Sequence, residues 1–264
     1  MTDAEFKEEV WARAHDLYRS MPWREEPSFY HVLVSELMLQ QTQVDRVRTK
    51  FAEFMRAFPS LESLAKASLS EVLVVWQGLG YNRRAKYLHE AAKHIVLQGT
   101  PHTRDELVLL PGVGNNTAGA LMNYVYEVPT AYVETNIRTV YFHHFFADSQ
   151  DISDKELLDI VERTIDHESP REWFYALMDY GTYLKKMGSG RLDVSKHYKK
   201  QSKLKGSVRE IRGEIIRILA KGPLSKIALV ERVAIDERFD KAFDGLVKDG
   251  LIVQKSRVVR LTNE

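Results

Sequence analysis

The apolar residues of the first 190 positions recur at helical spacing. They lie three or four positions apart in segments such as Phe6–Leu17, Val34–Met38 and Phe51–Phe58, which places them on one face of a helix. The pair Pro59 and Ser60 predicts the end of one helix and the cap of the next. Before residue 205 no segment alternates between apolar and polar residues, so the sequence predicts a mostly α protein.

Further helices are predicted from the same spacing and from the Ser, Pro and Gly residues between them. We expect them at residues 71–76, 83–97, 117–126, 153–167 and 172–186, with a short helix between Pro101 and Pro111. Gly78, Leu79 and Gly80 predict a turn.

The pattern changes after a predicted turn at Met187–Arg191. An amphipathic helix is predicted at Val208–Ala220, followed by two short helices at Lys226–Val233 and Asp240–Asp249. The apolar runs 251–253 and 258–261 then predict a β-hairpin. Three helices followed by a two-stranded wing are typical of a winged-helix module, which we place at residues 207–264.

Composition excludes several classes of protein. Of the 264 residues, 44% are hydrophobic and 28% are charged, which indicates a globular chain of one or two domains. No apolar run approaches the roughly 20 residues that span a bilayer, and the acidic, helical N-terminus does not resemble a secretion signal. We therefore expect a cytoplasmic protein. The absence of cysteine excludes disulfides, thiolate nucleophiles and iron–sulfur clusters.

Positive charge is concentrated in one stretch. Residues 185–212 contain ten Lys or Arg and two acidic residues, a net charge of +8, whereas the whole chain carries only +1. Such a block on an otherwise acidic protein suggests an anionic partner such as nucleic acid. A solvated linker is the alternative interpretation.

The strongest motif is the run LLPGVGNNTA at residues 109–118. Its glycines allow a tight turn, and the helix that follows presents backbone N–H groups that can bind a phosphate without reading bases. On this interpretation the residues expected to bind DNA are Gly112, Val113, Gly114, Asn115 and Thr117. An ordinary corner between two helices is the alternative.

Two other segments combine polar groups with apolar surroundings. Glu36 is the carboxylate of an otherwise apolar helix that continues into Gln40, Gln41 and Thr42, and a carboxylate among apolar neighbours can donate a proton near neutral pH. The turn after Trp76 offers side chains suited to insertion into DNA and to phosphate anchoring, namely Leu79, Tyr81, Arg83 and Arg84. A surface helix face and a packed turn are the respective alternatives.

In content and order these motifs resemble the helix-hairpin-helix DNA glycosylase superfamily, and within it the MutY-type adenine glycosylases. The resemblance runs from about Pro22 to Gly181, and the run SELMLQQTQV at residues 35–44 marks the subfamily. It implies a two-lobed, mostly α fold. A six-helix module at 28–132 would be inserted into a lobe formed by 1–27 and 133–206, with the active site in the cleft between them.

The resemblance also implies roles for individual residues. Glu36 falls at the acid that protonates adenine N7, Glu134 at the carboxylate that stabilises the cationic sugar, and Asn136 at the partner that orients this carboxylate. Gln41 and Tyr81 fall at the residues that wedge the duplex, and Gln40 and Thr42, on either side of Gln41, are expected to bind DNA with it. Trp23, Arg24 and Leu39 fall along the adenine pocket, and Asp179 falls where an acidic residue reads the adenine edge. The carbonyls of Val108, Leu110 and Val113 fall where the family often holds a monovalent cation.

The chain departs from the family pattern at four places. Family members have Asp where this chain has Glu134, and the bifunctional lyases have Lys where it has Asn116, so no Schiff base is expected there. Where the family has four cluster-ligating cysteines, this chain has a lysine-rich loop at residues 183–206, so we expect no iron–sulfur cofactor. Residues 207–264 are too few for the Nudix-like domain that recognises 8-oxoguanine.

The function expected from the resemblance is base excision repair by a monofunctional, monomeric DNA N-glycosylase. Its partner would be double-stranded DNA, from which it removes adenine mispaired with 8-oxoguanine or guanine. Two alternatives remain open: a mismatch thymine or uracil glycosylase of the same fold, and a DNA-binding protein that has lost catalysis.

Overall fold

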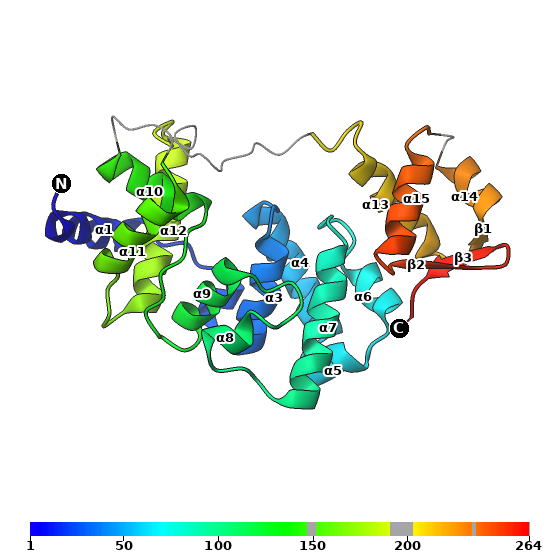
Figure 1. Ribbon diagram of the computed structural model, residues 1–264, viewed down its shortest axis with the longest axis horizontal. Coiled ribbons are helices and arrows are strands. Elements are labelled where there is room, and N and C mark those ends of the chain that lie inside the picture. The colour runs from blue at the N-terminus through cyan, green and yellow to red at the C-terminus, as the bar shows by residue number, and fades with distance from the viewer. Residues whose placement is uncertain (147–151, 191–202, 234–235, 264) are drawn as a thin grey trace. The chain divides into compact units, whose positions relative to one another are not determined.

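The computed structural model describes residues 1–146, 152–190, 203–233 and 236–263, which form two compact units (Figure 1). The first unit comprises residues 1–32, 102–109 and 113–200, and the second comprises residues 33–101, 110–112 and 201–264. Within the described residues no helix is long and apolar enough to cross a membrane.

The first unit is built around a long helix, α12 (Pro170–Lys186), which packs against α1 (Asp3–Leu17) and α10 (Thr135–Phe145). Aromatic side chains fill the space between these helices, and Phe6 and Trp173 are completely buried. The remaining elements are α2 (Pro22–Glu25), the start of α3 (Phe29–Leu39), α8 (Arg104–Leu107), α9 (Asn115–Tyr124) and α11 (Asp154–Thr164). Burial of several large rings in one core gives α12 a rigid setting.

The second unit begins within α3 and continues through α4 (Val44–Ala57), α5 (Leu61–Lys66), α6 (Leu69–Val75) and α7 (Arg83–Gln98). Ser60 and Ser68 cap α5 and α6 with capping boxes, as the serine positions predicted. The cap at Ser68 lets α6 begin two residues earlier than its apolar run indicated. Trp76 and Phe54 lie in the core of this unit.

The C-terminal module within the second unit has the predicted helices and hairpin. It consists of α13 (Val208–Leu219), β1 (Leu224–Ser225), α14 (Lys226–Arg232), α15 (Phe239–Lys248), β2 (Ile252–Lys255) and β3 (Val258–Leu261). The strand order is β1-β3-β2, and both pairs are antiparallel. Leu224 and Ser225 pair with Val259 and Val258, which adds a short third strand to the predicted hairpin.

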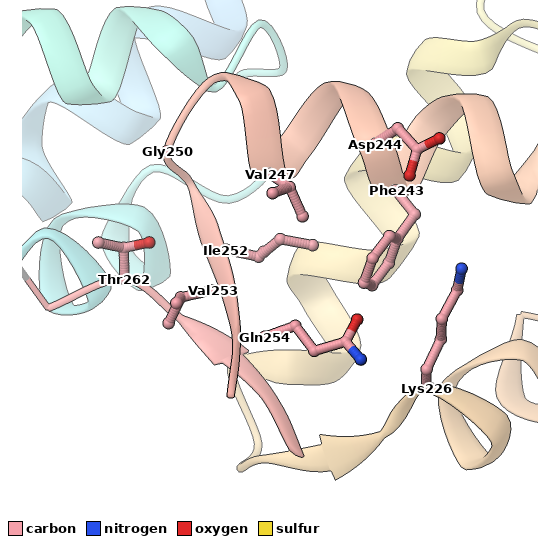
Figure 2. Close-up of a pocket in the computed structure, with 9 residues that line it drawn as sticks. All are labelled: Lys226, Phe243, Asp244, Val247, Gly250, Ile252, Val253, Gln254 and Thr262. Carbon is pink, nitrogen blue, oxygen red and sulfur yellow. The ribbon is translucent and has the colours of Figure 1, made fainter. Parts of the chain in front are cut away.

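An open pocket of about 540 Å³ lies on this module between α15 and β2 (Figure 2). The ammonium of Lys226 lies 4.6 Å from the centre of the Phe243 ring. None of the residues predicted to carry chemistry lines it: the lining residues are Lys226, Phe243, Asp244, Val247, Gly250, Ile252, Val253, Gln254 and Thr262.

Candidate active site and DNA-binding elements

Glu134 caps the N-terminus of α10 with its own side chain. Its Oε1 accepts hydrogen bonds from the backbone N–H groups of Asn136 (2.5 Å) and Ile137 (3.1 Å), and Oε2 accepts one from Nδ2 of Asn136 (3.4 Å). Burial raises the pKa of Glu134, and the positive charge of Lys185 and these hydrogen bonds oppose the rise. Three of the roughly four acceptor positions of the carboxylate are used by these hydrogen bonds.

The side chain and backbone of Asn136 are held in place by α12. Thr182 Oγ1 lies 3.3 Å from Asn136 Oδ1, so that the amide nitrogen faces Glu134. A Cβ on Gly181 would lie 2.4 Å from the Asn136 carbonyl oxygen, so only glycine allows this approach. Gly181 and Thr182 therefore position the predicted catalytic pair, and no local sequence pattern indicates this contribution.

Asn116 is hydrogen-bonded to the backbone of the segment that leads into Glu134. Its Nδ2 donates a 2.6 Å hydrogen bond to the carbonyl of Val133, the residue before Glu134. Gly119, one turn later in α9, packs so closely on Tyr132 that a Cβ would approach the tyrosine Cβ to 2.8 Å. The structure thus joins α9 to the segment that carries Glu134, although the two are distant in sequence.

Asp179 lies at the centre of a buried ion-pair cluster in the first unit. Its two oxygens accept four hydrogen bonds, from the backbone N–H (3.1 Å) and Nε (2.6 Å) of Arg19 and from both terminal nitrogens of Arg24 (2.7 and 3.1 Å). A carboxylate offers about four acceptor positions, so Asp179 is saturated. Direct readout of adenine by Asp179 stays a prediction; in this conformation, its observed role is to clamp α12 to the N-terminal segment.

We expect Asp179→Asn to lower the free energy of unfolding by about 3 kcal/mol, because it leaves two buried or half-buried guanidinium groups without their counter-charge. The matched control is Asp154→Asn: Asp154 pairs with Arg138 at 2.6 Å, but its side chain is 42% exposed, so the loss should stay below about 1 kcal/mol. Urea unfolding of both variants measures the difference. Equal losses would contradict a structural role for Asp179.

Trp23 and Arg24, the other predicted pocket residues of the first unit, are buried in α2. The Arg24 guanidinium also lies 4.3 Å from the centre of the Tyr175 ring. Glu36 and Leu39 belong to the second unit, where Glu36 is the half-buried carboxylate of the apolar helix α3. Assembly of these residues into one pocket stays a prediction.

The glycine-rich hairpin connects α8 to α9. Gly112 has a φ of +79°, and a Cβ there would lie 2.8 Å from the Cβ of Tyr87, so the position requires glycine. Gly114 is the N-cap of α9 and, like Asn115, is exposed, as phosphate binding requires. By contrast, Val113 and Thr117 are buried. The predicted monovalent cation at the carbonyls of Val108, Leu110 and Val113 remains a prediction.

Arg84 connects the two turns that carry the predicted wedge residues. At the turn of Gln41, its buried guanidinium donates to the carbonyls of Leu37 and Met38 (2.8 Å each) and Gln40 (2.5 Å) and to Thr42 Oγ1 (3.0 Å). At the turn of Tyr81, it donates to the carbonyls of Leu79 (3.0 Å) and Gly80 (3.1 Å). Burial lowers the pKa of Arg84 to about 10. Of the paired arginines, Arg83 is the exposed one. Phosphate binding by Arg84 stays a prediction; its observed hydrogen bonds support the turns from inside.

Both predicted wedge residues have a strained backbone. Gln41 and Tyr81 have backbone φ values of +56° and +45°, which residues other than glycine rarely adopt. The two turns touch where Thr42 Oγ1 donates a 3.3 Å hydrogen bond to the carbonyl of Leu79. The first turn also contacts the glycine-rich hairpin, because Gln40 Nε2 donates a 3.3 Å hydrogen bond to the carbonyl of Gly112. Strained positions that the surroundings hold in place are typical of functional sites.

The residues do not fit an iron–sulfur cluster, because the chain has no cysteine thiolate to bind one. The described ranges also contain no group of three or more His, Asp or Glu side chains that could hold a metal ion. Of the lysine-rich loop, Lys196, Lys199 and Lys200 lie outside the described residues, whereas Lys203 and Lys205 are exposed.

Comparison with known proteins identifies the class. A family model described as the HhH-GPD superfamily of base excision DNA repair proteins matches residues 34–165. An adenine DNA glycosylase of Mycolicibacterium smegmatis is 31% identical over 259 residues, which cover 89% of this chain and 88% of that protein. The chain therefore belongs to the HhH-GPD superfamily.

Other relatives match over shorter lengths. The adenine DNA glycosylase of Rattus norvegicus is 38% identical over 178 residues, covering 62% of this chain and 34% of that protein. That of Buchnera aphidicola (subspecies Baizongia pistaciae) is 30% identical over 173 residues, covering 63% of this chain and 48% of that protein. The chain thus spans about a third of the rat protein and half of the Buchnera protein.

Solved structures confirm the predicted fold class. A thermostable thymine-DNA glycosylase matches with a TM-score of 0.61 and 24% identity, over 68% of this chain and 85% of that chain. Endonuclease III in a trapped covalent intermediate with DNA matches with a TM-score of 0.58 and 19% identity, over 69% of this chain and 87% of that chain. At these identities the likeness concerns the helical glycosylase fold.

Proposed function

We propose that this protein is a DNA N-glycosylase of base excision repair that removes adenine mispaired with 8-oxoguanine or guanine. The observation that carries the proposal is the match to an adenine DNA glycosylase along 89% of the chain. The arrangement around Glu134 supports it, because a half-buried carboxylate with a spare acceptor position suits a developing positive charge.

The proposed reaction uses two carboxyl groups in different protonation states. The adenosine is flipped out of the duplex, and Glu36 donates a proton to N7 of adenine, which makes the base a better leaving group. The bond between N9 and C1′ then breaks, and the ionised Glu134 stabilises the cationic sugar. Water adds its oxygen to C1′ and releases a proton to solvent, leaving free adenine and an abasic site.

The glutamate at position 134 is compatible with this role through its use as a helix cap. A carboxylate that is one methylene longer than aspartate extends by roughly 1 Å, enough to lower the rate if nothing compensates. In this chain Oε1 folds back onto two N–H groups of α10. The cap thereby fixes the longer side chain in one orientation.

A single-turnover assay on a panel of duplexes tests the proposal. Adenine opposite 8-oxoguanine and guanine should be released faster than adenine opposite cytosine or thymine, and adenine paired with thymine serves as the matched control. Release of thymine or uracil opposite guanine would instead identify a pyrimidine mismatch glycosylase. Tight binding without release of any base would identify a DNA-binding protein that has lost catalysis.

We further propose that the lysine-rich stretch binds the DNA backbone in place of the cluster loop. Each neutralised phosphate contributes about −0.9 to the slope of log affinity against log salt. Changing the exposed Lys186, Lys203 and Lys205 to glutamine should therefore weaken binding to matched and mismatched DNA alike and flatten this slope.

The control for this prediction is a triple variant of exposed lysines elsewhere, at Lys66, Lys93 and Lys155. Both triple variants lose the same net charge, so only a local phosphate contact separates them. Equal salt slopes for wild type and the variant of the lysine-rich stretch would show that this stretch is a solvated linker.

A further inference from the structure

The ring of Tyr81 contacts two guanidinium groups from different parts of the second unit. The centre of its ring is 5.5 Å from Cζ of Arg84, in α7, and 5.1 Å from Cζ of Arg209, in α13 of the C-terminal module. Arg209 Nη1 also donates a hydrogen bond to the Tyr81 hydroxyl oxygen. The strained residue predicted to enter the duplex thus contacts one arginine of α7 and one of the C-terminal module.

The contact between Arg209 and Tyr81 is part of a larger junction between α13, α15 and α7. Asp249, at the end of α15, forms an ion pair with Arg212 of α13, with 2.5 Å between Oδ2 and Nη2. The same oxygen lies 3.7 Å from Nε of Arg83 in α7. The backbone carbonyl of Asp249 accepts a 2.9 Å hydrogen bond from Lys86 of α7. Asp249 thus links α13, the helix that carries Arg209, to the first turn of α7, which follows the Tyr81 turn.

We propose that Arg209 is a positioning residue that holds Tyr81 in the conformation that enters mismatched DNA, so that the C-terminal module contributes to mismatch discrimination. The proposal rests on the proposed function. A side chain fixed before binding avoids the entropic cost of ordering it in the complex. The strained backbone of Tyr81 makes such support necessary, because the left-handed conformation persists only where neighbouring groups hold it.

The effect of Arg209 should depend on Tyr81 and on the mismatch. A partly exposed cation–π contact corresponds to about a two- to fivefold change in an equilibrium constant. Arg209→Gln should therefore reduce the ratio of matched to mismatched dissociation constants by about two- to fivefold. Arg209→Lys retains a cation over the ring and should recover most of the ratio.

A double-mutant cycle with Arg209→Gln and Tyr81→Ala tests this dependence. The probe is a duplex with 2′-fluoro-2′-deoxyadenosine opposite 8-oxoguanine, which binds but resists hydrolysis, compared with the matched duplex. We expect Arg209→Gln to have no further effect on discrimination once Tyr81 is alanine, since residues that act through one another are not additive. Arg217→Gln, on the same helix and exposed beside Glu214, is the matched control and should leave the ratio unchanged.

Several results of these binding measurements would overturn the proposal. Additive effects in the cycle would show that Arg209 acts independently of Tyr81. Equal weakening of both duplexes with a flatter salt slope would show that Arg209 only binds phosphate. An increase in discrimination in Arg209→Gln would show that Arg209 restrains Tyr81 from entering DNA.

Thermal unfolding of Arg209→Lys checks that the fold of this variant is intact. If Arg209→Lys were as stable as the wild type but no longer preferred mismatched over matched DNA, the proposal would also be contradicted. Binding is measured without base release. A wild-type protein that released no base would therefore refute the proposed function, while the cycle would still report on the coupling of Arg209 to Tyr81.

Discussion

Changing Glu36 to glutamine is expected to abolish base release while DNA binding is retained. Glutamine has nearly the same shape but cannot donate a carboxylic acid proton, and general acid catalysis of this kind contributes about 10²–10⁴-fold to the rate. Glu36 is half-buried on an otherwise apolar helix, so the exchange removes little packing. Single-turnover rates at saturating enzyme, together with dissociation constants for the same mismatched duplex, separate the two effects.

The matched control is Glu53→Gln, which removes an exposed carboxylate that pairs with Lys50 on the surface of α4. It should leave both the rate and the affinity unchanged. If Glu36→Gln released adenine within a few-fold of the wild-type rate, Glu36 would not be the acid.

The second large effect is expected for Glu134→Gln, which should lower the rate of base release by about 10²–10³-fold, the usual cost of losing electrostatic stabilisation. The amide oxygen of glutamine can still accept from the N–H groups of Asn136 and Ile137. Only the 3.4 Å hydrogen bond from Nδ2 of Asn136 is lost, because the amide nitrogen of glutamine cannot accept it, so stability should change little. Burial raises the pKa of Glu134, so at pH values above the ordinary carboxyl pKa the ionised carboxylate destabilises the folded state. Glutamine carries no charge, and in that pH range the variant should therefore be at least as stable as the wild type.

The raised pKa of Glu134 also sets a direction for the pH dependence. The reaction requires the ionised carboxylate, so the wild-type rate should fall as the pH drops through this raised pKa, above the range where an exposed glutamate titrates. A pH profile of the single-turnover rate measures this. Undiminished activity of Glu134→Gln, or a large loss of its stability, would contradict the role given to Glu134.

Local signals were sufficient to predict most of the helices. Ser60, Ser68 and Ser153 each precede a helix that they cap, because their hydroxyl oxygens accept from the third N–H of that helix. The helix α10 was not predicted, since its run of β-branched and aromatic residues lacks a clear helical stripe. Its N-cap is the side chain of Glu134, and a glutamate is not the usual sign of a helix start.

The supports of the candidate site could not be predicted, because they depend on contacts between distant segments. Arg83 and Arg84 are identical in sequence terms, but only Arg84 turns inward to the carbonyls of Leu37 and Met38. Arg19 meets Asp179 across 160 positions. Thr182 carries no recognisable motif, and its place beside Asn136 follows only from the packing of α12 on α10.

The most direct test of the proposed function is to identify the products of one turnover on adenine opposite 8-oxoguanine by mass spectrometry, without heat or alkali. We expect free adenine and an unbroken DNA strand that carries an abasic site, because Asn116 offers no amine to form a Schiff base. Failure to release adenine from this duplex would contradict the central claim, and a broken strand with a borohydride-trapped adduct would contradict a purely hydrolytic reaction.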